Sequence, residues 1–574
     1  MNQAVLARWT GISLPAILVV ASLPVAGCTS GTDGTGASVP KALSVDSPEV
    51  TGYVALPSLD RAIDGIVALG QELLPGVTSK ERVKEQIGAF LGDPTLEYLD
   101  TTRPIVLVLL SGTPPGPPPW AILASVKEGA PYGQMVTAMD MEAKQDGSLL
   151  MVAGAPEVLE QDATLRAVYD RVRGAEIGET ARLYLDTGRL LDAYGPLVDA
   201  QISAMEQLLP AGRAEAPGGV DFASMVEILK LEVMGLKKLL SLVAEVQLGL
   251  EVGGQGVRCD TILVAKQGSS LARCFARSAR LRPEFPALKQ KGFVEATYAI
   301  DPQGISDVMK DVLDDISRDP TGARFVSSEL TSLLTNMAGW WTGTAATSVD
   351  LAGGTDVEFE FVMGVKDEQK FLEMVEQSVA LYQPGSPFHE VYQQLGMDYS
   401  SKLERNVRKH AGVAVHRLSV SVKADPQKLG PAAALASMDM TGEMAVVAGR
   451  AVMSHDPAGL DRLVDSARSG GAGEEFALAS RKAFGAGRHA YVVYDVFGLL
   501  RDLAQSMPEG LGKTMFQGVV GEISSNVPLV GAVTFQENRA RLEGKIPVDF
   551  LKEFAKLVPL MGGAGSPLPP EPPK

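Results

Sequence analysis

Five histidines could take part in acid–base or metal chemistry, and all lie in the second half of the chain: His389, His410, His416, His455 and His489. A zinc protease would place two histidines four residues apart, as H-E-x-x-H. The stretch HEVYQ begins correctly at His389 but has Gln393 where the second histidine belongs. His410 and His416 have a spacing that suits neither one helical face nor a strand pair. The spacing predicts no metal site, and it favours surface or helix-capping positions for these histidines.

Other motifs for catalysis or phosphate binding are incomplete. The stretch GLGKT at 510–514 matches the end of a phosphate-binding loop, but such a loop requires a glycine where Met507 stands and a strand before it. The preceding residues, FGLLRDLAQSM, have a helical pattern instead. Neither a G-x-S-x-G nucleophile elbow nor a calcium-loop spacing occurs. We therefore expect no catalytic residue, no metal and no cofactor, and interpret the chain as a non-enzyme.

Cys28 is the residue whose surroundings point to a covalent modification. It follows the stretch LPVAG, which ends an apolar run that has a single charge, Arg8, ahead of it. A positive start, a short apolar segment and small residues at its end are typical of a secretory signal peptide. Pro15 and Pro24 interrupt the run too early for a membrane-spanning helix. The residues Val25-Ala26-Gly27-Cys28 resemble the lipobox of bacterial lipoproteins.

The lipobox resemblance implies where the protein is located. In that family the thiol receives a diacylglycerol, the leader is cut before the cysteine, and the new amino terminus is acylated. We expect a signal peptide at 1–27, a palmitate-type anchor at Cys28 and a Gly-, Ser- and Thr-rich flexible tether at 28–48. A plain signal peptide or an uncleaved anchor is the alternative. Thr29, where an aspartate would favour retention in the inner membrane, favours the outer membrane of the cell envelope.

Cys259 and Cys274 are the remaining cysteines, in a compartment where disulfides persist. A disulfide closing a loop of about 15 residues would contribute about 3 kcal/mol. However, RCDTILVAK has the pattern of a strand and SSLARCFARSA that of a helix, so direct bridging requires a bend in the chain. Two interpretations stay open: a disulfide, or two buried free thiols.

Three aspartates follow apolar strand patterns and precede helical ones: Asp186, Asp301 and Asp495. Their carboxylates could form one cluster, which would be a functional site. An aspartate at a strand-to-helix junction also caps the free N–H groups of the helix. We favour repeated capping.

Two apolar features could bind a ligand. The stretch from Phe222 to Val246 has apolar residues every three or four positions, which predicts one long helix with a wide apolar face. Five residues of this face are candidates to line a groove for lipid: Val226, Leu229, Val233, Leu236 and Leu240. A helix packed between two layers is the alternative. Trp340 and Trp341 could dip into a membrane or stack on a sugar, although one core and one partly exposed ring is the commoner arrangement.

Composition limits the classes of partner. The 574 residues are 45% hydrophobic, enough for sizeable cores, and the net charge is -17. This acidic balance argues against nucleic acid and against electrostatic docking on anionic lipid. The Pro-rich end at 561–574 contains no core-forming pattern and is expected to be disordered.

The body repeats its own pattern. The stretch WAILASVKEGAPYGQM from Trp120 matches FEFVMGVKDEQKFLEM from Phe359, MVAG at 151–154 matches VVAG at 446–449, and ARLYLDTGRLLDAYG matches AYVVYDVFGLLRDLA. The offset grows along the chain, which predicts an insertion in the second copy within 384–440. We expect an α+β fold of two tandem duplicated copies, at 49–282 and 291–560, joined by a linker at 283–290. The two copies could pack as a pseudo-symmetric pair.

The second copy resembles a family of bacterial envelope proteins known as a domain of unknown function. The likeness rests on FEFVMGVKDEQKFLEMVE, AVVAGRAVMSHDPAGLDRLVDSA and AYVVYDVFGLLRDLA. It implies no catalytic residue. Taken together, the sequence favours a lipid-anchored envelope protein that binds a partner or has a structural role. The alternative is a periplasmic carrier of lipid or another hydrophobic ligand.

Overall fold

The computed structural model describes residues 47–561, apart from gaps at 77, 91–92, 94, 113–117, 128–129, 131, 133–140, 176, 209–221, 289–291, 353–355, 430–436, 471–472, 474–475 and 507–509. The predictions for the signal peptide, Cys28, nearly all of the tether and the Pro-rich end lie outside the described residues. The fold class is α+β, as predicted: helices pack on a large antiparallel sheet.

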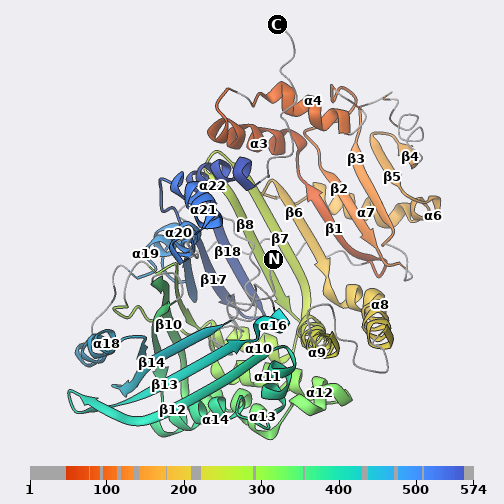
Figure 1. Ribbon diagram of the computed structural model, residues 1–574. Helices are drawn as coiled ribbons and strands as arrows, with labels where there is room; N and C mark the ends of the chain where they lie inside the picture. Colours follow the sequence, from red (N-terminus) through yellow and green to blue (C-terminus); the bar gives the residue numbers. More distant parts are fainter. Residues whose placement is uncertain are drawn as a thin grey trace.

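A single sheet of 18 described strands runs through the molecule, and every pairing in it is antiparallel (Figure 1). Eight strands from the first half of the chain lie in the order β4 (Glu142–Asp146), β5 (Leu149–Ala153), β3 (Trp120–Ser125), β2 (Ile105–Leu110), β1 (Val50–Leu56), β6 (Ala181–Asp186), β7 (Val243–Gly253) and β8 (Gly256–Ala265).

The sheet continues from β8 without a break into strands of the second half. They lie in the order β18 (Arg539–Pro547), β17 (Leu529–Gln536), β16 (Ala490–Tyr494), β9 (Val294–Ala299), β10 (Trp341–Ala352), β11 (Asp356–Val365), β15 (Arg450–Ser454), β14 (Met438–Val447), β13 (Val413–Ala424) and β12 (Met397–His410). The two expected copies are therefore joined by backbone hydrogen bonds between β8 and β18, in addition to the linker.

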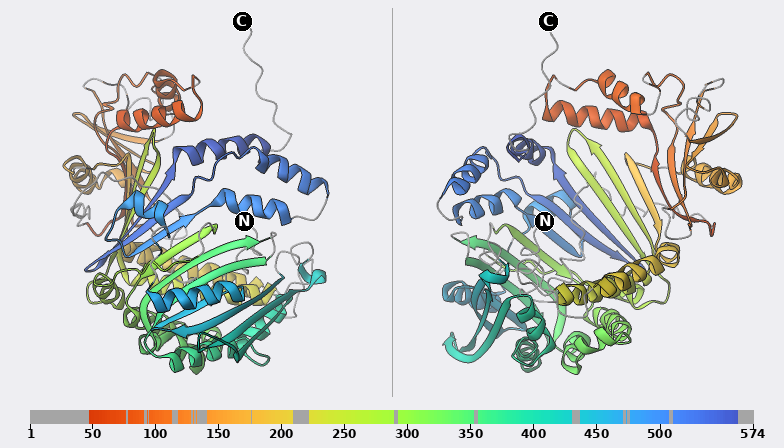
Figure 2. Two further views of the ribbon diagram at one scale, coloured as in Figure 1. Left: turned by 90° about the vertical axis from the view of Figure 1, so that its left-hand side faces the viewer. Right: turned by 45° about the vertical axis from the view of Figure 1, so that its right-hand side comes forward.

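Helices lie on both faces of the sheet, and the sheet bends between its two ends (Figure 2). The first half contributes α3 (Leu59–Leu73), α4 (Lys80–Phe90), α6 (Pro156–Leu159), α7 (Asp162–Arg173), α8 (Thr187–Leu208), α9 (Phe222–Ser241) and α10 (Ser270–Ser278). The second half contributes α11 (Pro302–Ile316), α12 (Pro320–Phe325), α13 (Ser328–Thr335), the 3₁₀ turn η1 (Met337–Gly339), α14 (Glu368–Ala380), α15 (Pro387–Gln394), α16 (Pro426–Leu429), α18 (Pro457–Ser469), α19 (Leu478–Phe484), α20 (Val496–Ser506), α21 (Leu511–Gly521) and α22 (Val548–Met561).

The cores form where these helices meet the sheet. In the first half, α7 covers one face of β1, β2, β3 and β5, while α3 and α4 pack on the opposite face. In the second half, α18 and α19 cover one face, and α11, α13 and α14 cover the other. Strands β2, β3 and β5 are apolar toward both faces, as expected for strands enclosed between helices.

The long helix predicted from Phe222 to Val246 is shorter than expected. Helix α9 ends at Ser241, and β7 begins at Val243. The physical reason is the pattern of VAEVQLGLEV, in which apolar residues alternate with period two and so favour a strand. The predicted helix therefore covered two elements, the end of α9 and the beginning of β7, which meet at Leu242.

Candidate functional site

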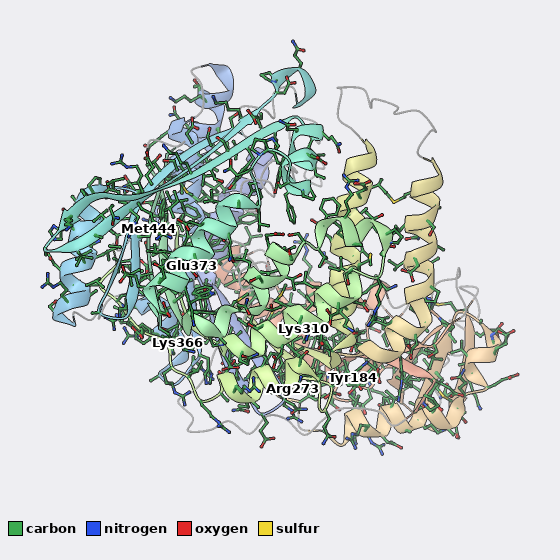
Figure 3. The ribbon with its side chains drawn as sticks, turned by 90° about the horizontal axis from the view of Figure 1, so that it is seen from below. Tyr184, Arg273, Lys310, Lys366, Glu373 and Met444 are labelled. Atoms are coloured by element: carbon green, nitrogen blue, oxygen red, sulfur yellow. The ribbon has the colours of Figure 1, made fainter. Side chains whose placement is uncertain are left out.

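The five apolar residues predicted to line a ligand groove on α9 differ in their exposure. Val226 is buried, and Val233 and Leu240 are half-buried. Leu229 and Leu236 are 39% and 56% exposed. Helix α9 packs on α8 along one side and on α11 along another, and Figure 3 shows α8 and α9 running side by side. Helix α9 therefore packs between two neighbouring helices, in line with the alternative interpretation. Leu229 and Leu236 form an exposed row on its remaining side, which we call the α9 leucine row.

Three lysines flank the α9 leucine row, and each is paired. Lys230 lies 3.0 Å from Asp319, which caps α12, and Lys237 lies 2.6 Å from Asp199 on α8. Lys238 lies 3.9 Å from Asp315 on α11. These pairs connect α9 to its neighbours, and Glu232, exposed between the two leucines, adds a carboxylate to the row.

The base of the α8–α9 hairpin holds the beginning of the described chain. The guanidinium of Arg189, in the first turn of α8, donates hydrogen bonds to the carbonyl oxygens of Ser47 and Val50. Asp186 accepts from the backbone N–H of Arg189, which fixes this turn at the end of β6. Ser47, next to the last residue of the tether expected at 28–48, is thus attached to the start of α8.

Cys259 and Cys274 are free thiols, and both are buried. Cys259 pairs in register with Leu250 and Gly544 inside the sheet, whereas Cys274 lies on α10 against Gly304 of α11. Burial raises the pKa of the Cys274 thiol to about 12, so that it stays protonated at neutral pH. Of the two interpretations left open, the structure has the free thiols, because strand and helix carry the two side chains to different neighbours.

We predict that neither thiol reacts in the folded protein. At pH 8, a chain whose Cys28 is acylated or replaced by alanine should show no reaction with a disulfide-exchange reagent. The reaction requires a cysteine side chain that the reagent can reach and that is deprotonated to the thiolate. After denaturation without reductant, two thiols per chain should react. A denatured, unreduced chain with no reactive thiol would instead establish a disulfide.

The three strand-to-helix aspartates act as helix caps, as favoured. Asp301 accepts from the N–H of Gly304 at 2.6 Å, and Asp495 accepts from that of Gly498 at 2.8 Å. The amide of Asp495 bonds to Phe293, at the opposite end of β9 from Asp301. These carboxylates therefore do not form a cluster.

Three histidines are more buried than predicted. His389, His416 and His489 are buried, because they point into packed layers rather than capping exposed helices. Burial lowers the pKa of His489, and its ring contacts the carbonyl of Ala279 and the guanidinium of Arg282 in the segment that joins the two halves. His410 lies 3.0 Å from Asp465. Among the described residues, no three histidine, cysteine or acidic side chains are placed to hold a metal ion.

His455 lines a small cavity over β10, β11 and β15. The cavity measures about 10 Å³ and is bounded by Ser348, Glu358, Glu360 and Gly292 as well. Such a volume holds about one water molecule. Glu360 is ion-paired with Arg462 of α18. The arrangement offers no room for an organic substrate.

The tryptophan pair belongs to the core. Trp340 and Trp341 are both buried, their rings lie 6.4 Å apart, and the indole N–H of Trp341 donates to the carbonyl of Thr344. Neither ring is available to a membrane or a sugar. The 510–514 stretch begins α21 after helix α20, which agrees with its interpretation as no phosphate loop.

Sequence reasoning missed a group of buried charges where β8 pairs with β18. Arg541 makes two parallel hydrogen bonds to Asp260, at 2.8 and 2.9 Å. Glu543 is directly opposite Asp260 in register and lies 2.9 Å from Arg488. Both carboxylates are less than 10% exposed, and burial raises the pKa of Glu543 even though the two arginines lower it. We call these four residues the seam cluster; the alternation of VRCDTIL and ARLEGKI was its only signal.

Comparison with known proteins gives no relative: no family model, no curated protein and no solved structure matches the chain. Within the part of the chain that the structure describes, none of the helices has the length and apolar character needed to cross a bilayer.

Proposed function

We propose that the protein is a lipid-anchored component of a bacterial cell envelope, held by acyl groups on Cys28, and that its body is a non-enzymatic binding or structural module. The observation that carries this proposal is the lipobox-like run Val25-Ala26-Gly27-Cys28 behind an apolar leader. Several acyl chains give stable anchoring, whereas one gives only marginal binding. The outer membrane is favoured because Thr29 follows the cysteine.

The body is further proposed to be a tandem duplication, and the strand order supports this. The series β4-β5-β3-β2-β1-β6-β7-β8 has a counterpart in β14-β15-β11-β10-β9-β16-β17-β18. The hairpin β12–β13 has no equivalent in the first half in this comparison, and it would be the insertion expected within 384–440. The last helix of each half packs against the first helix of the other, α10 on α11 and α22 on α3.

The join between the halves supports a pseudo-two-fold relation. Arg258 and Asp260 on β8 have the same spacing as Arg541 and Glu543 on β18, and Asp260 faces Glu543 in register. One detail of the sequence comparison would change. In the strand order, β5 of the first half is equivalent to β15 of the second half. MVAG at 151–154 therefore corresponds to β15, and not to VVAG at the end of β14.

The alternative function, a carrier of lipid or another hydrophobic ligand, has one supporting observation. Leu229 and Leu236 are exposed on a helix that sequence reasoning singled out for apolar binding. Native mass spectrometry of the protein, together with a solvent extract, would show a stoichiometric lipid if the carrier function were right.

The experiment for the anchor compares cysteines within one chain. Cells expressing the protein would be fed an alkyne-tagged fatty acid, and the purified chain tested for label and for partition into a detergent-rich phase. We expect the Cys28→Ala variant to lose the label completely and to leave the detergent phase, because no other acylation site is expected. The matched control, Cys259→Ser with Cys274→Ser, should label normally. Undiminished label on Cys28→Ala would refute the proposal.

A further inference from the structure

We propose that the α9 leucine row rests on the surface of the bilayer that holds Cys28, so that the α8–α9 hairpin sets the orientation of the body on the membrane. The inference rests on the proposed anchor and deepens it. It assigns the row to a lipid surface of zwitterionic headgroups, and not to a protein partner.

The geometry of the row suits a shallow contact. Leu229 and Leu236 are seven residues apart on one helix, which places both on the same face about 10 Å apart along the axis. Their exposure of 39% and 56% contrasts with the burial of Val226 on the same helix. Because α8 and α11 cover other sides of α9, the helix cannot turn to hide the two side chains. An interfacial helix buries its apolar face about 5–10 Å into the boundary between headgroups and acyl chains.

The tether brings this hairpin to the bilayer. About 19 residues separate Cys28 from Ser47 and can span at most about 65 Å when extended. Ser47 is bound by Arg189 at the start of α8, at the base of the hairpin. An acyl anchor therefore holds the α8–α9 end of the body within reach of the lipid.

Local charge selects the kind of surface. The chain has a net charge of -17, which repels anionic lipid. Around the row, however, Lys230, Lys237 and Lys238 are each paired with an aspartate. Glu232 adds a carboxylate between the two leucines, but zwitterionic headgroups carry no net charge and so do not repel it. The lysine stems can add apolar contact while the ammonium groups stay in the headgroup layer.

The test uses the full acylated chain in phosphatidylcholine vesicles that contain bromine-labelled lipid, a quencher of fluorescence. A polarity-sensitive fluorophore is attached at Glu232→Cys, an exposed position between the two leucines. The native thiols at 259 and 274 are buried, which directs the label to the new cysteine. The matched control is Gln71→Cys, an exposed position on α3 next to Leu74, which is itself 56% exposed.

We expect the lipid to quench the α9 probe on the order of threefold and to leave the α3 probe unchanged. Adding Leu229→Ser with Leu236→Ser should abolish the quenching while the chain still floats with the vesicles. A floating chain with an unquenched α9 probe overturns this inference alone, and a chain that does not float overturns the anchor. A probe signal that depends on protein concentration and persists without lipid assigns the row to a second copy, which also overturns the inference.

Discussion

Replacing Arg541 by leucine is expected to lower the free energy of unfolding by about 3–5 kcal/mol, because it leaves Asp260 buried without its guanidinium partner. Arg541 lies 3.7 Å from Glu543 as well, so that Glu543 loses one of its two arginine partners and keeps only Arg488. The measurement is urea denaturation of the purified protein, followed by circular dichroism.

Two comparisons make this result specific to the seam cluster. Arg318 and Asp315 also pair at 3.0 Å, but the arginine side chain is 74% exposed; Arg318→Ala should therefore cost less than about 1 kcal/mol. The double variant Arg541→Leu with Asp260→Leu should recover much of the loss, because an apolar pair needs no compensation. A loss for Arg541→Leu as small as that of Arg318→Ala would show that the cluster does not stabilise the β8–β18 pairing.

The second large effect is expected at Gly304, where α10 and α11 approach most closely. A Cβ at this position would lie 2.5 Å from Cα and 2.9 Å from Sγ of Cys274. Since backbone cannot move aside as a flexible side chain can, Gly304→Ala should destabilise the protein by about 1–3 kcal/mol. It should also make Cys274 reactive toward thiol reagents in the folded state, which the disulfide-exchange assay measures.

Gly518 offers the matched control for this substitution. It lies inside helix α21, and a Cβ there meets no atom within 4 Å. Alanine should therefore stabilise the protein by about 0.5–1 kcal/mol, through the lower entropy of its unfolded chain. Equal effects of the two substitutions would contradict the close approach of α10 and α11.

Local patterns carried most of what the sequence could predict. Asp301 and Asp495 were recognised as helix caps because the capping residue and the N–H it accepts from are neighbours in sequence. The strand at Cys259 and the helix at Cys274 were likewise correct. The end of α9 was wrong, since two apolar periodicities meet at Leu242 and a window that spans both cannot separate them.

Burial and long-range pairing could not be predicted in the same way. Trp340, Trp341, His416 and His489 are buried, and a pattern of polar and apolar residues around each position does not indicate it. The seam cluster depends on the register between β8 and β18, which a single sequence does not determine. The candidate α9 residues were chosen correctly as apolar, but only packing against α8 and α11 separates the exposed leucines from the buried valine.

The junction of β8 with β18 has a consequence for how the protein is made. Asp260 and Arg541 are separated by 281 residues, so that the edge of β8 stays open until nearly the whole chain has been synthesised. An open edge of this kind is a template for pairing with another chain. Sheets that depend on such distant partners form slowly and expose aggregation-prone surface meanwhile. Arg258 and Asp260 place charges on β8 while its edge is still unpaired. Charged side chains on an exposed edge are one way in which natural proteins prevent edge-to-edge association.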